Sequence, residues 1–183
     1  LSRRLPVQNL VLGKPSFLWI ILFYTGLCLM HKTLKKRSYL KYACLLACGC
    51  FLALDVQKGQ DKISFLDVGQ GDCIALSLNR QDMILVDGGS SSKQDVGRYI
   101  IAPYIKSQGY QAVSAAVITH LDSDHYSGIR ELLPSGMIRR LYLPRVKKDH
   151  AYMEIEKEAE QYHVPVGYLS MGSKFSGSSG FRE

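Results

Sequence analysis

Two long apolar runs in the first third of the chain constrain its fold most strongly. They extend over residues 16–30 and 42–54, and neither shows the 3.6-residue polar alternation of a surface helix. A basic connector at residues 31–37 lies between them, as expected for a short cytoplasmic loop. The pattern predicts two transmembrane helices, at about residues 10–30 and 38–54, and the alternative is a pair of helices buried in a soluble core.

The positive charge of the chain lies almost entirely in this first third. The formal net charge is +7, and residues 1–60 hold nine Lys and Arg side chains but one acidic side chain. The remaining residues hold 14 basic and 15 acidic side chains. The charge therefore indicates membrane topology and contact with anionic lipid headgroups rather than a nucleic-acid-binding surface. A cytoplasmic connector places everything after Asp55 on the outer face of the membrane.

A different pattern begins after residues 1–56 and a short polar linker at residues 57–61. Alternating segments predict three consecutive antiparallel strands, and helix–strand units follow them. This order predicts a layered α+β domain with helices outside a sheet. The strands are expected at residues 62–68, 72–78, 83–87, 115–119, 140–143 and 166–170, and the helices at 94–108 (bent or shortened at Pro103), 127–133 and 149–162.

The residue types that carry chemistry gather where the strand at 115–119 ends. His120, Asp122, Asp124 and His125 fall within six positions. Their joint desolvation is costly unless a positive charge lies among them, and a divalent cation supplies that charge. In an extended segment His120 and Asp122 project to the same side. The other two side chains can turn toward a second point, so the spacing favours two metal ions that share a site.

The carboxylates in this group affect the choice of metal. A carboxylate in the place of an imidazole makes the ligand set harder, which shifts the preference toward manganese or magnesium without excluding zinc. The alternative interpretation is a solvated loop between a strand and a helix, with Asp124 as the helix N-cap. A cap explains one of the four residues and leaves the other three without a role.

Three phrases of the sequence resemble the ComEC family of competence proteins. Residues 65–72 read FLDVGQGD, residues 85–89 read LVDGG and residues 119–125 read THLDSDH. The last phrase is similar to the HxHxDH metal motif of the metallo-β-lactamase fold, in the form HxDxDH. The resemblance extends over residues 62–170 and includes the two preceding spans. It implies that residues 62–183 form the N-terminal half of a metallo-β-lactamase-like αββα domain.

Carried over to this sequence, the resemblance implies a hydrolase centre with two metal ions, manganese or zinc. His120 and Asp122 would bind one ion. Asp124 and His125 would bind the other. Asp124 is also the expected catalytic residue, because it would hold or deprotonate the attacking water.

Further polar residues are expected around these ligands. The resemblance implies that Asp87, at the end of its strand, braces the histidine loop, as carboxylates behind metal ligands often do. The glycines of the first phrase allow a tight turn that would bring Asp67, Gln70 and Asp72 near the metals. The alternative for these three is a hairpin turn with Asx-type hydrogen bonds.

The later ligands of the metallo-β-lactamase fold are not recognisable in this sequence. They are a third histidine, a bridging aspartate and a final histidine, and they should follow the strand at 166–170. His150 and His163 are the remaining downstream histidines, and both are expected to face solvent because neither follows an apolar strand. The sequence is therefore expected to be a piece of a longer protein, with an incomplete metal site.

The resemblance implies a multi-pass protein of the bacterial cytoplasmic membrane that takes up DNA in natural transformation. Its extracytoplasmic domain would be a metal-dependent phosphodiesterase or nuclease. The expected partners are single-stranded DNA or other incoming DNA, membrane lipid and other competence proteins. Two alternatives are a membrane-anchored hydrolase of a small ester, thioester or lactam, and a non-catalytic remnant. A local basic stretch could contact a phosphate backbone, and the alternative is a solvated strand end: Arg139, Arg140, Arg145, Lys147 and Lys148.

Overall fold

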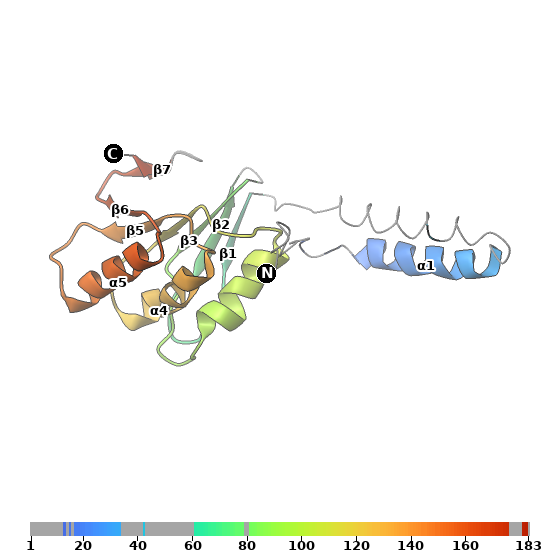
Figure 1. Ribbon diagram of the computed structural model, residues 1–183, viewed down its shortest axis with the longest axis horizontal. Coiled ribbons are helices and arrows are strands. Elements are labelled where there is room, and N and C mark those ends of the chain that lie inside the picture. Colours follow the sequence, from blue (N-terminus) through green and yellow to red (C-terminus); the bar gives the residue numbers. More distant parts are fainter. Residues whose placement is uncertain are drawn as a thin grey trace, which may run out of the picture. The chain divides into compact units, whose positions relative to one another are not determined.

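The chain divides into two units, which are described separately. They are Leu1–Gln57 and Lys58–Glu183. The computed structural model describes residues 13, 15, 17–33, 42, 61–78, 81–175 and 181–182. Figure 1 labels the helices and strands in chain order.

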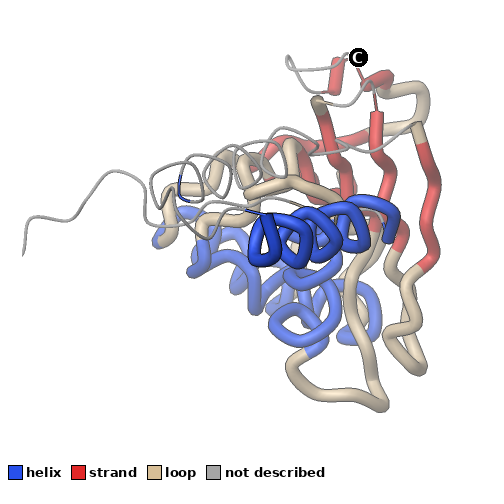
Figure 2. The backbone as a smooth tube through the Cα atoms, turned by 90° about the vertical axis from the view of Figure 1, so that its right-hand side faces the viewer, coloured by secondary structure: helices blue, strands red, loops and turns tan. Residues whose placement is uncertain are grey.

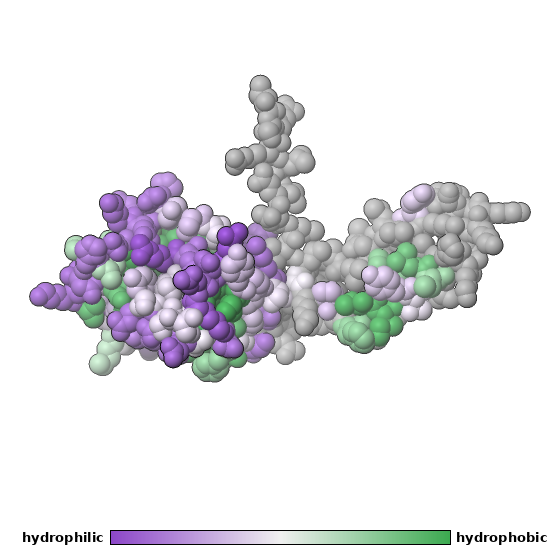
Figure 3. All heavy atoms as spheres, turned by 90° about the horizontal axis from the view of Figure 1, so that it is seen from below, coloured by the Kyte–Doolittle hydropathy of each residue, from purple (hydrophilic) through white to green (hydrophobic). Residues whose placement is uncertain are grey.

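The described part of the first unit consists mainly of helix α1 (Phe17–Thr33). Its exposed side chains include Phe17 and Tyr24, and Figure 3 shows hydrophobic residues along this helix. Across the described residues no helix is long and apolar enough to span a membrane, so the two expected transmembrane helices are not supported. The second of them, at 38–54, lies outside the described residues except for Tyr42.

The second unit is built on a six-stranded sheet with the strand order β1-β2-β3-β4-β5-β6. The first three strands are antiparallel and the remaining pairings are parallel. This arrangement confirms the predicted antiparallel strands followed by helix–strand units, and Figure 2 shows the strands side by side. The strands are β1 (Lys62–Phe65), β2 (Ile74–Leu78), β3 (Asp82–Val86), β4 (Ala115–Val117), β5 (Leu141–Pro144) and β6 (Val166–Leu169).

The described helices of the second unit pack on one face of this sheet. Ile105, Ile129 and Ile155 of the helices join Leu85 and Leu141 of the strands in one buried core. Figure 2 shows these helices on one side of the strands. Alternate strand residues form a separate buried cluster on the opposite face. The helices are η1 (Gly97–Ile101), α3 (Ala102–Ser107), α4 (Ser123–Leu132), η2 (Leu133–Ser135) and α5 (His150–Gln161).

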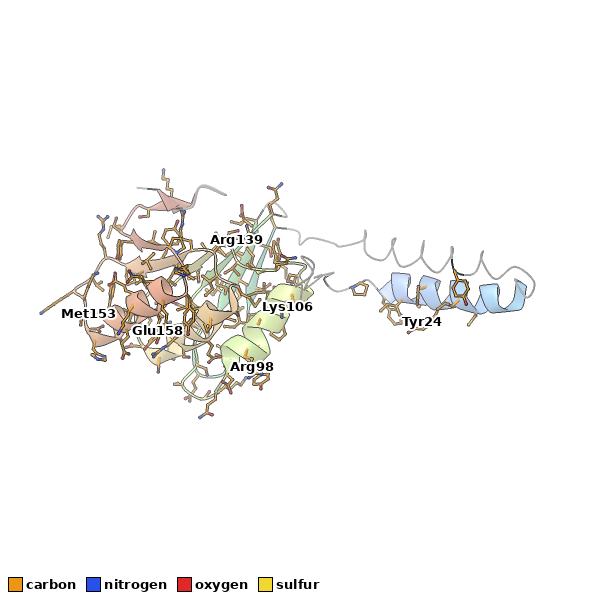
Figure 4. The ribbon with its side chains drawn as sticks, viewed as in Figure 1. Tyr24, Arg98, Lys106, Arg139, Met153 and Glu158 are labelled. Carbon is orange, nitrogen blue, oxygen red and sulfur yellow. The ribbon has the colours of Figure 1, made fainter. Side chains whose placement is uncertain are left out.

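Polar contacts fix helix α5 in the second unit. The Asp149 carboxylate accepts a hydrogen bond from the Tyr152 backbone N–H at 2.8 Å, so Asp149 is the N-cap of α5. Arg130 of α4 donates through Nε to both carboxylate oxygens of Glu158, a residue of α5 that Figure 4 labels. The predicted helix at 149–162 is therefore confirmed with nearly the expected bounds.

Two helical segments differ from the sequence prediction for local reasons. The segment expected at 94–108 contains a π-helical turn, η1, before α3, because Pro103 has no N–H to donate to the carbonyl four residues earlier. Helix α4 begins at Ser123, four residues before the predicted start. Asp122, whose backbone is extended, is the N-cap of α4. The Asp124 carboxylate in the first turn interacts favourably with the helix dipole.

A small two-stranded sheet follows the six-stranded one along the chain. It pairs β7 (Lys174–Phe175) with β8 (Phe181–Arg182) in antiparallel fashion. Nothing in the sequence pattern predicted these strands. Residues 176–180, between these two strands in the sequence, lie outside the described residues.

The parallel strands determine where the chemically important residues lie. Val86, Val117 and Tyr142 are neighbours in register on β3, β4 and β5. The carboxyl ends of parallel strands meet at one edge of a sheet, which is where ligands bind in many α/β proteins. The loops that begin at Asp87 and at Ile118 therefore leave the sheet side by side.

Cys73 offers a test of this buried core. Burial raises the pKa of the Cys73 thiol from its ordinary 9.0 to about 12, and the nearby Asp87 adds to the shift. The thiol therefore stays neutral at pH 7–8, and its contribution to folding stability is lost as the pH rises from about 9 toward 12. We expect N-ethylmaleimide to modify the exposed Cys28 of the folded protein and to modify Cys73 only in denaturant, as measured by peptide mass spectrometry. Comparable rates for the two thiols in the folded protein would contradict the structure.

Candidate metal centre

The candidate site is organised by Asp87, which follows strand β3. Its side chain is 7% exposed, and it is the one acidic residue buried among those that the structure describes. The carboxylate accepts from the Thr119 backbone N–H at 2.8 Å and from the Thr119 hydroxyl at 2.7 Å. Its Oδ2 also lies 3.1 Å from His125 Nδ1. These contacts satisfy the buried charge and tie the ends of β3 and β4 to the start of α4.

The backbone of Asp87 is held in an unusual conformation. Its φ of 56° lies in the left-handed region, where aspartate is more frequent than most residues but still disfavoured. The Asp87 N–H donates to the Val117 carbonyl at 2.8 Å, which pins the backbone to the neighbouring strand. This conformation turns the chain out of the sheet while its side chain contacts the loop after β4.

Glycines let the first turn of α4 approach this loop closely. The Gly88 N–H donates to the His125 carbonyl at 2.7 Å, and the Asp72 N–H donates to the Asp124 carbonyl at 3.2 Å. A Cβ atom on Gly89 would lie 2.6 Å from the Asp124 carbonyl carbon. Because this neighbour is backbone and cannot rotate away, the position requires glycine.

The four predicted metal ligands lie together, as two pairs. The rings of His120 and His125 are 3.6 Å apart between centroids. Asp122 Oδ2 is 3.6 Å from His120 Nε2, and Asp124 Oδ2 is 3.7 Å from His125 Nε2. Each pair thus offers one imidazole nitrogen and one carboxylate oxygen. The motif spans the end of the loop after β4 and the first turn of α4, rather than one extended segment.

The donor chemistry of these pairs fits part of a divalent-metal site. His125 Nδ1 faces the Asp87 carboxylate, which can only accept, so the proton of this ring is on Nδ1. Nε2 is then the atom of His125 that can ligate a metal. Among the described residues, however, no three His, Cys, Asp or Glu side chains converge on a single metal position. An ion bound by either pair therefore needs further ligands.

Asp67 is bound by Lys93 and Gly69. Its Oδ1 accepts from the Lys93 ammonium at 3.1 Å and from the Gly69 backbone N–H at 3.1 Å. The hydrogen bond from Lys93 lowers the pKa of Asp67, and the Gly69 bond acts in the same direction. The contact with Gly69 is the Asx-type turn that the sequence left open as an alternative.

The other two residues of the FLDVGQGD phrase differ in their relation to the histidines. The Gln70 backbone N–H donates to Ser92 Oγ at 2.8 Å, which joins the two loops. Asp72 is closer to the site, since its Oδ2 is 3.9 Å from His125 Nδ1. The fold therefore brings Asp72 beside the predicted ligand His125.

Two residues with contacts in this region were given no role from the sequence. Thr119 binds Asp87 through its backbone and its hydroxyl, and its position directly before His120 was the available signal. Ser127 Oγ accepts from the Ser90 N–H at 3.0 Å, which fixes α4 to the loop after β3. His150 and His163 are exposed, as expected.

Comparison with known proteins identifies similar sequences. Residues 66–167 match the model of the family described as the Metallo-beta-lactamase superfamily. The chain is also 22% identical over 157 residues to ComE operon protein 3 of Bacillus subtilis (strain 168), a match that covers 76% of this chain and 20% of that protein. This similarity confirms the predicted resemblance to ComEC-type proteins. The chain spans about a fifth of the length of that relative.

Two solved structures of the DIM-1 metallo-β-lactamase are also similar. The one exposed to ceftazidime is 16% identical with a TM-score of 0.36, and the match covers 62% of this chain and 48% of that chain. The other is 14% identical with a TM-score of 0.38, and the match covers 63% of this chain and 55% of that chain.

Replacing the buried carboxylate tests the network. We expect Asp87→Asn to lower the free energy of unfolding by about 1–3 kcal/mol, because an amide cannot accept all three hydrogen bonds. Urea unfolding followed by circular dichroism measures this change. Asp82→Asn, at the other end of β3, is the matched control, since Asp82 accepts from the Ser114 hydroxyl at 2.5 Å. Equal losses in the two variants would contradict a special role for Asp87.

Proposed function

Because the chain belongs to the metallo-beta-lactamase superfamily, we propose that it forms the metal-dependent hydrolase part of a bacterial DNA-uptake protein. Its substrate in this proposal is the phosphodiester bond of incoming DNA. The similarity to ComE operon protein 3 supports the assignment to DNA uptake. The observation that carries the hydrolase assignment is the pair of histidines held beside Asp122 and Asp124 by the Asp87 network.

The protein residues have separate roles in this proposal. His120 and Asp122 hold one divalent ion, and the next two motif residues, Asp124 and His125, hold the other. Bound manganese or zinc supplies Lewis acidity toward a phosphoryl oxygen. The Asp124 carboxylate, which is 37% exposed, orients the attacking water and accepts its proton. Asp87 keeps the ring of His125 in one orientation.

The basic stretch noted in the sequence is divided by strand β5. Arg139 and Arg140 precede β5, whereas Arg145, Lys147 and Lys148 follow its carboxyl end. The second group is therefore at the edge of the sheet that also holds His120, because β4 and β5 are parallel. Lys148 is bound by the Glu156 carboxylate at 2.7 and 2.8 Å, while Lys147 is exposed. Contact with a phosphate backbone is proposed for Lys147 and its neighbours.

The location and the partners are part of the same proposal. The basic connector at 31–37 supports a cytoplasmic loop, so the metal centre would face the outside of the bacterial cytoplasmic membrane. The partners would be single-stranded DNA or other incoming DNA, membrane lipid and other competence proteins. A periplasmic or extracellular reporter fused after Glu183 should be active, and a reporter active only in the cytoplasm would reverse this topology.

Nuclease activity tests the proposed reaction. We expect the full-length domain that contains these residues, supplied with Mn²⁺ or Zn²⁺, to cleave fluorescently labelled single-stranded DNA, and Asp124→Ala to reduce the rate about 100-fold or more. His125→Ala should behave in the same way, whereas the exposed His150→Ala should leave the rate unchanged. Undiminished cleavage by both site variants would refute the assignment. Hydrolysis of a β-lactam without DNA cleavage would favour the small-substrate alternative.

DNA binding tests the proposed substrate contact. Lys147→Gln should weaken binding of a single-stranded oligonucleotide and reduce the slope of log K against log salt by about 1, as expected for the loss of one phosphate contact. Arg139→Gln is the matched control, because Arg139 is exposed at the opposite end of β5 and is labelled in Figure 4. Fluorescence anisotropy at several salt concentrations measures both. The same slope change in both variants would remove the basis for this surface.

A further inference from the structure

The Thr119 hydroxyl lies between the Asp87 carboxylate and the ring of His120. Its Oγ1 is 2.7 Å from Asp87 Oδ2 and 3.0 Å from His120 Nδ1. On the other side of the same carboxylate, Oδ2 is 3.1 Å from His125 Nδ1. One chain of short contacts therefore runs from His125 through Asp87 and Thr119 to His120.

Proton counting assigns a direction to each hydrogen bond in this chain. The Asp87 carboxylate has no proton to give, so the Thr119 hydroxyl donates its single proton to Asp87. Oγ1 can then only accept from His120. His120 Nδ1 must carry the proton of that ring, which leaves Nε2 with a free lone pair.

We propose that Thr119 is a positioning residue that sets the tautomer of His120 on behalf of Asp87. Asp87 sets the tautomer of His125 directly and that of His120 through the Thr119 hydroxyl. Both rings then carry their proton on Nδ1 and offer Nε2, the atoms that lie 3.6 Å from the carboxylate of Asp122 and 3.7 Å from that of Asp124. A single carboxylate thereby prepares one nitrogen in each ligand pair.

The opposite tautomer of His120 is disfavoured by the same geometry. With the proton on Nε2, a nitrogen lone pair would face an oxygen lone pair at 3.0 Å, because the Thr119 proton is committed to Asp87. The contact would then change from a hydrogen bond to a repulsion between two acceptors. Thr119 thus acts on His120 without touching a substrate or a metal.

The metal role of this arrangement rests on the proposed function, whereas the tautomer assignment can be tested without a metal. The protein labelled with ¹⁵N-histidine is measured metal-free at about pH 8, where free imidazole is neutral, by two-bond ¹H–¹⁵N correlation spectra. We expect His120 and His125 both to show the Nδ1–H tautomer. A predominant Nε2–H tautomer for His120 in the unaltered protein would overturn the proposal.

Variants separate this role from a general structural one. Thr119→Val removes the hydroxyl with little change in shape, and it should abolish the preference of His120 while His125 keeps its Nδ1–H tautomer. Thr119→Ser should restore the preference of His120. Ser114→Ala is the matched control, because it removes a hydroxyl-to-aspartate hydrogen bond before the same strand, β4. An unchanged His120 tautomer in Thr119→Val would overturn the proposal.

Zinc titration separates the effect of Thr119 on the His120 tautomer from its effect on metal binding. In the full-length domain, Thr119→Val should bind Zn²⁺ about 10–100-fold more weakly than the unaltered protein, and Thr119→Ser should recover most of the affinity. Absence of zinc binding in the unaltered protein, together with the expected tautomers, would refute the proposed function and leave the role of Thr119 intact. Unaltered zinc affinity in Thr119→Val would refute the metal role of Thr119.

Discussion

A buried carboxylate must have its charge satisfied, and at Asp87 that requirement organises the whole site. Three hydrogen-bond donors reach this carboxylate from two places, the loop after β4 and the first turn of α4. Without these donors, the Asp87 carboxylate would be a buried charge without a partner, because its side chain is only 7% exposed. The bonds that satisfy Asp87 are therefore the bonds that fix the positions of both histidines.

The surrounding fold makes this arrangement possible. Parallel pairing of β3 with β4 places the loops after the two strands at the same edge, and the close contact at Gly89 lets α4 begin directly against them. The left-handed backbone of Asp87 then turns its carboxylate toward Thr119. The strained backbone of Asp87 and the lack of a side chain at Gly89 have the same explanation. Both let the loop after β3, the loop after β4 and the first turn of α4 come together.

Part of this site could be predicted from the sequence, because the clustering of His120, Asp122, Asp124 and His125 after an apolar strand is visible without coordinates. Hydrogen-bond direction could not be predicted, since it depends on the distance between the Thr119 hydroxyl and a carboxylate 32 positions away. For Asp67 the structure shows bonds with Lys93 and Gly69, and the Gly69 bond is the Asx-type contact that the sequence allowed as an alternative.

The positions of the strands along the chain were also predictable, because the pattern of apolar residues reports on burial in a sheet, whereas their spatial order and the parallel pairings were not predicted. The start of α4 was placed four residues late, since the polar motif hides the first helical turn. Apolar composition predicted two membrane spans, but no helix among the described residues is long and apolar enough to cross a membrane, and most of the second predicted span lies outside those residues.

We propose that Asp87 orients both histidines so that their Nε2 atoms are the ones that bind metal. Anomalous diffraction from crystals grown with zinc tests this proposal, because it locates the metal without reference to activity. We expect zinc peaks at about 2.0–2.1 Å from Nε2 of His120 and of His125. Peaks bonded to Nδ1 of either ring, or zinc bound elsewhere with both Nε2 atoms vacant, would contradict it.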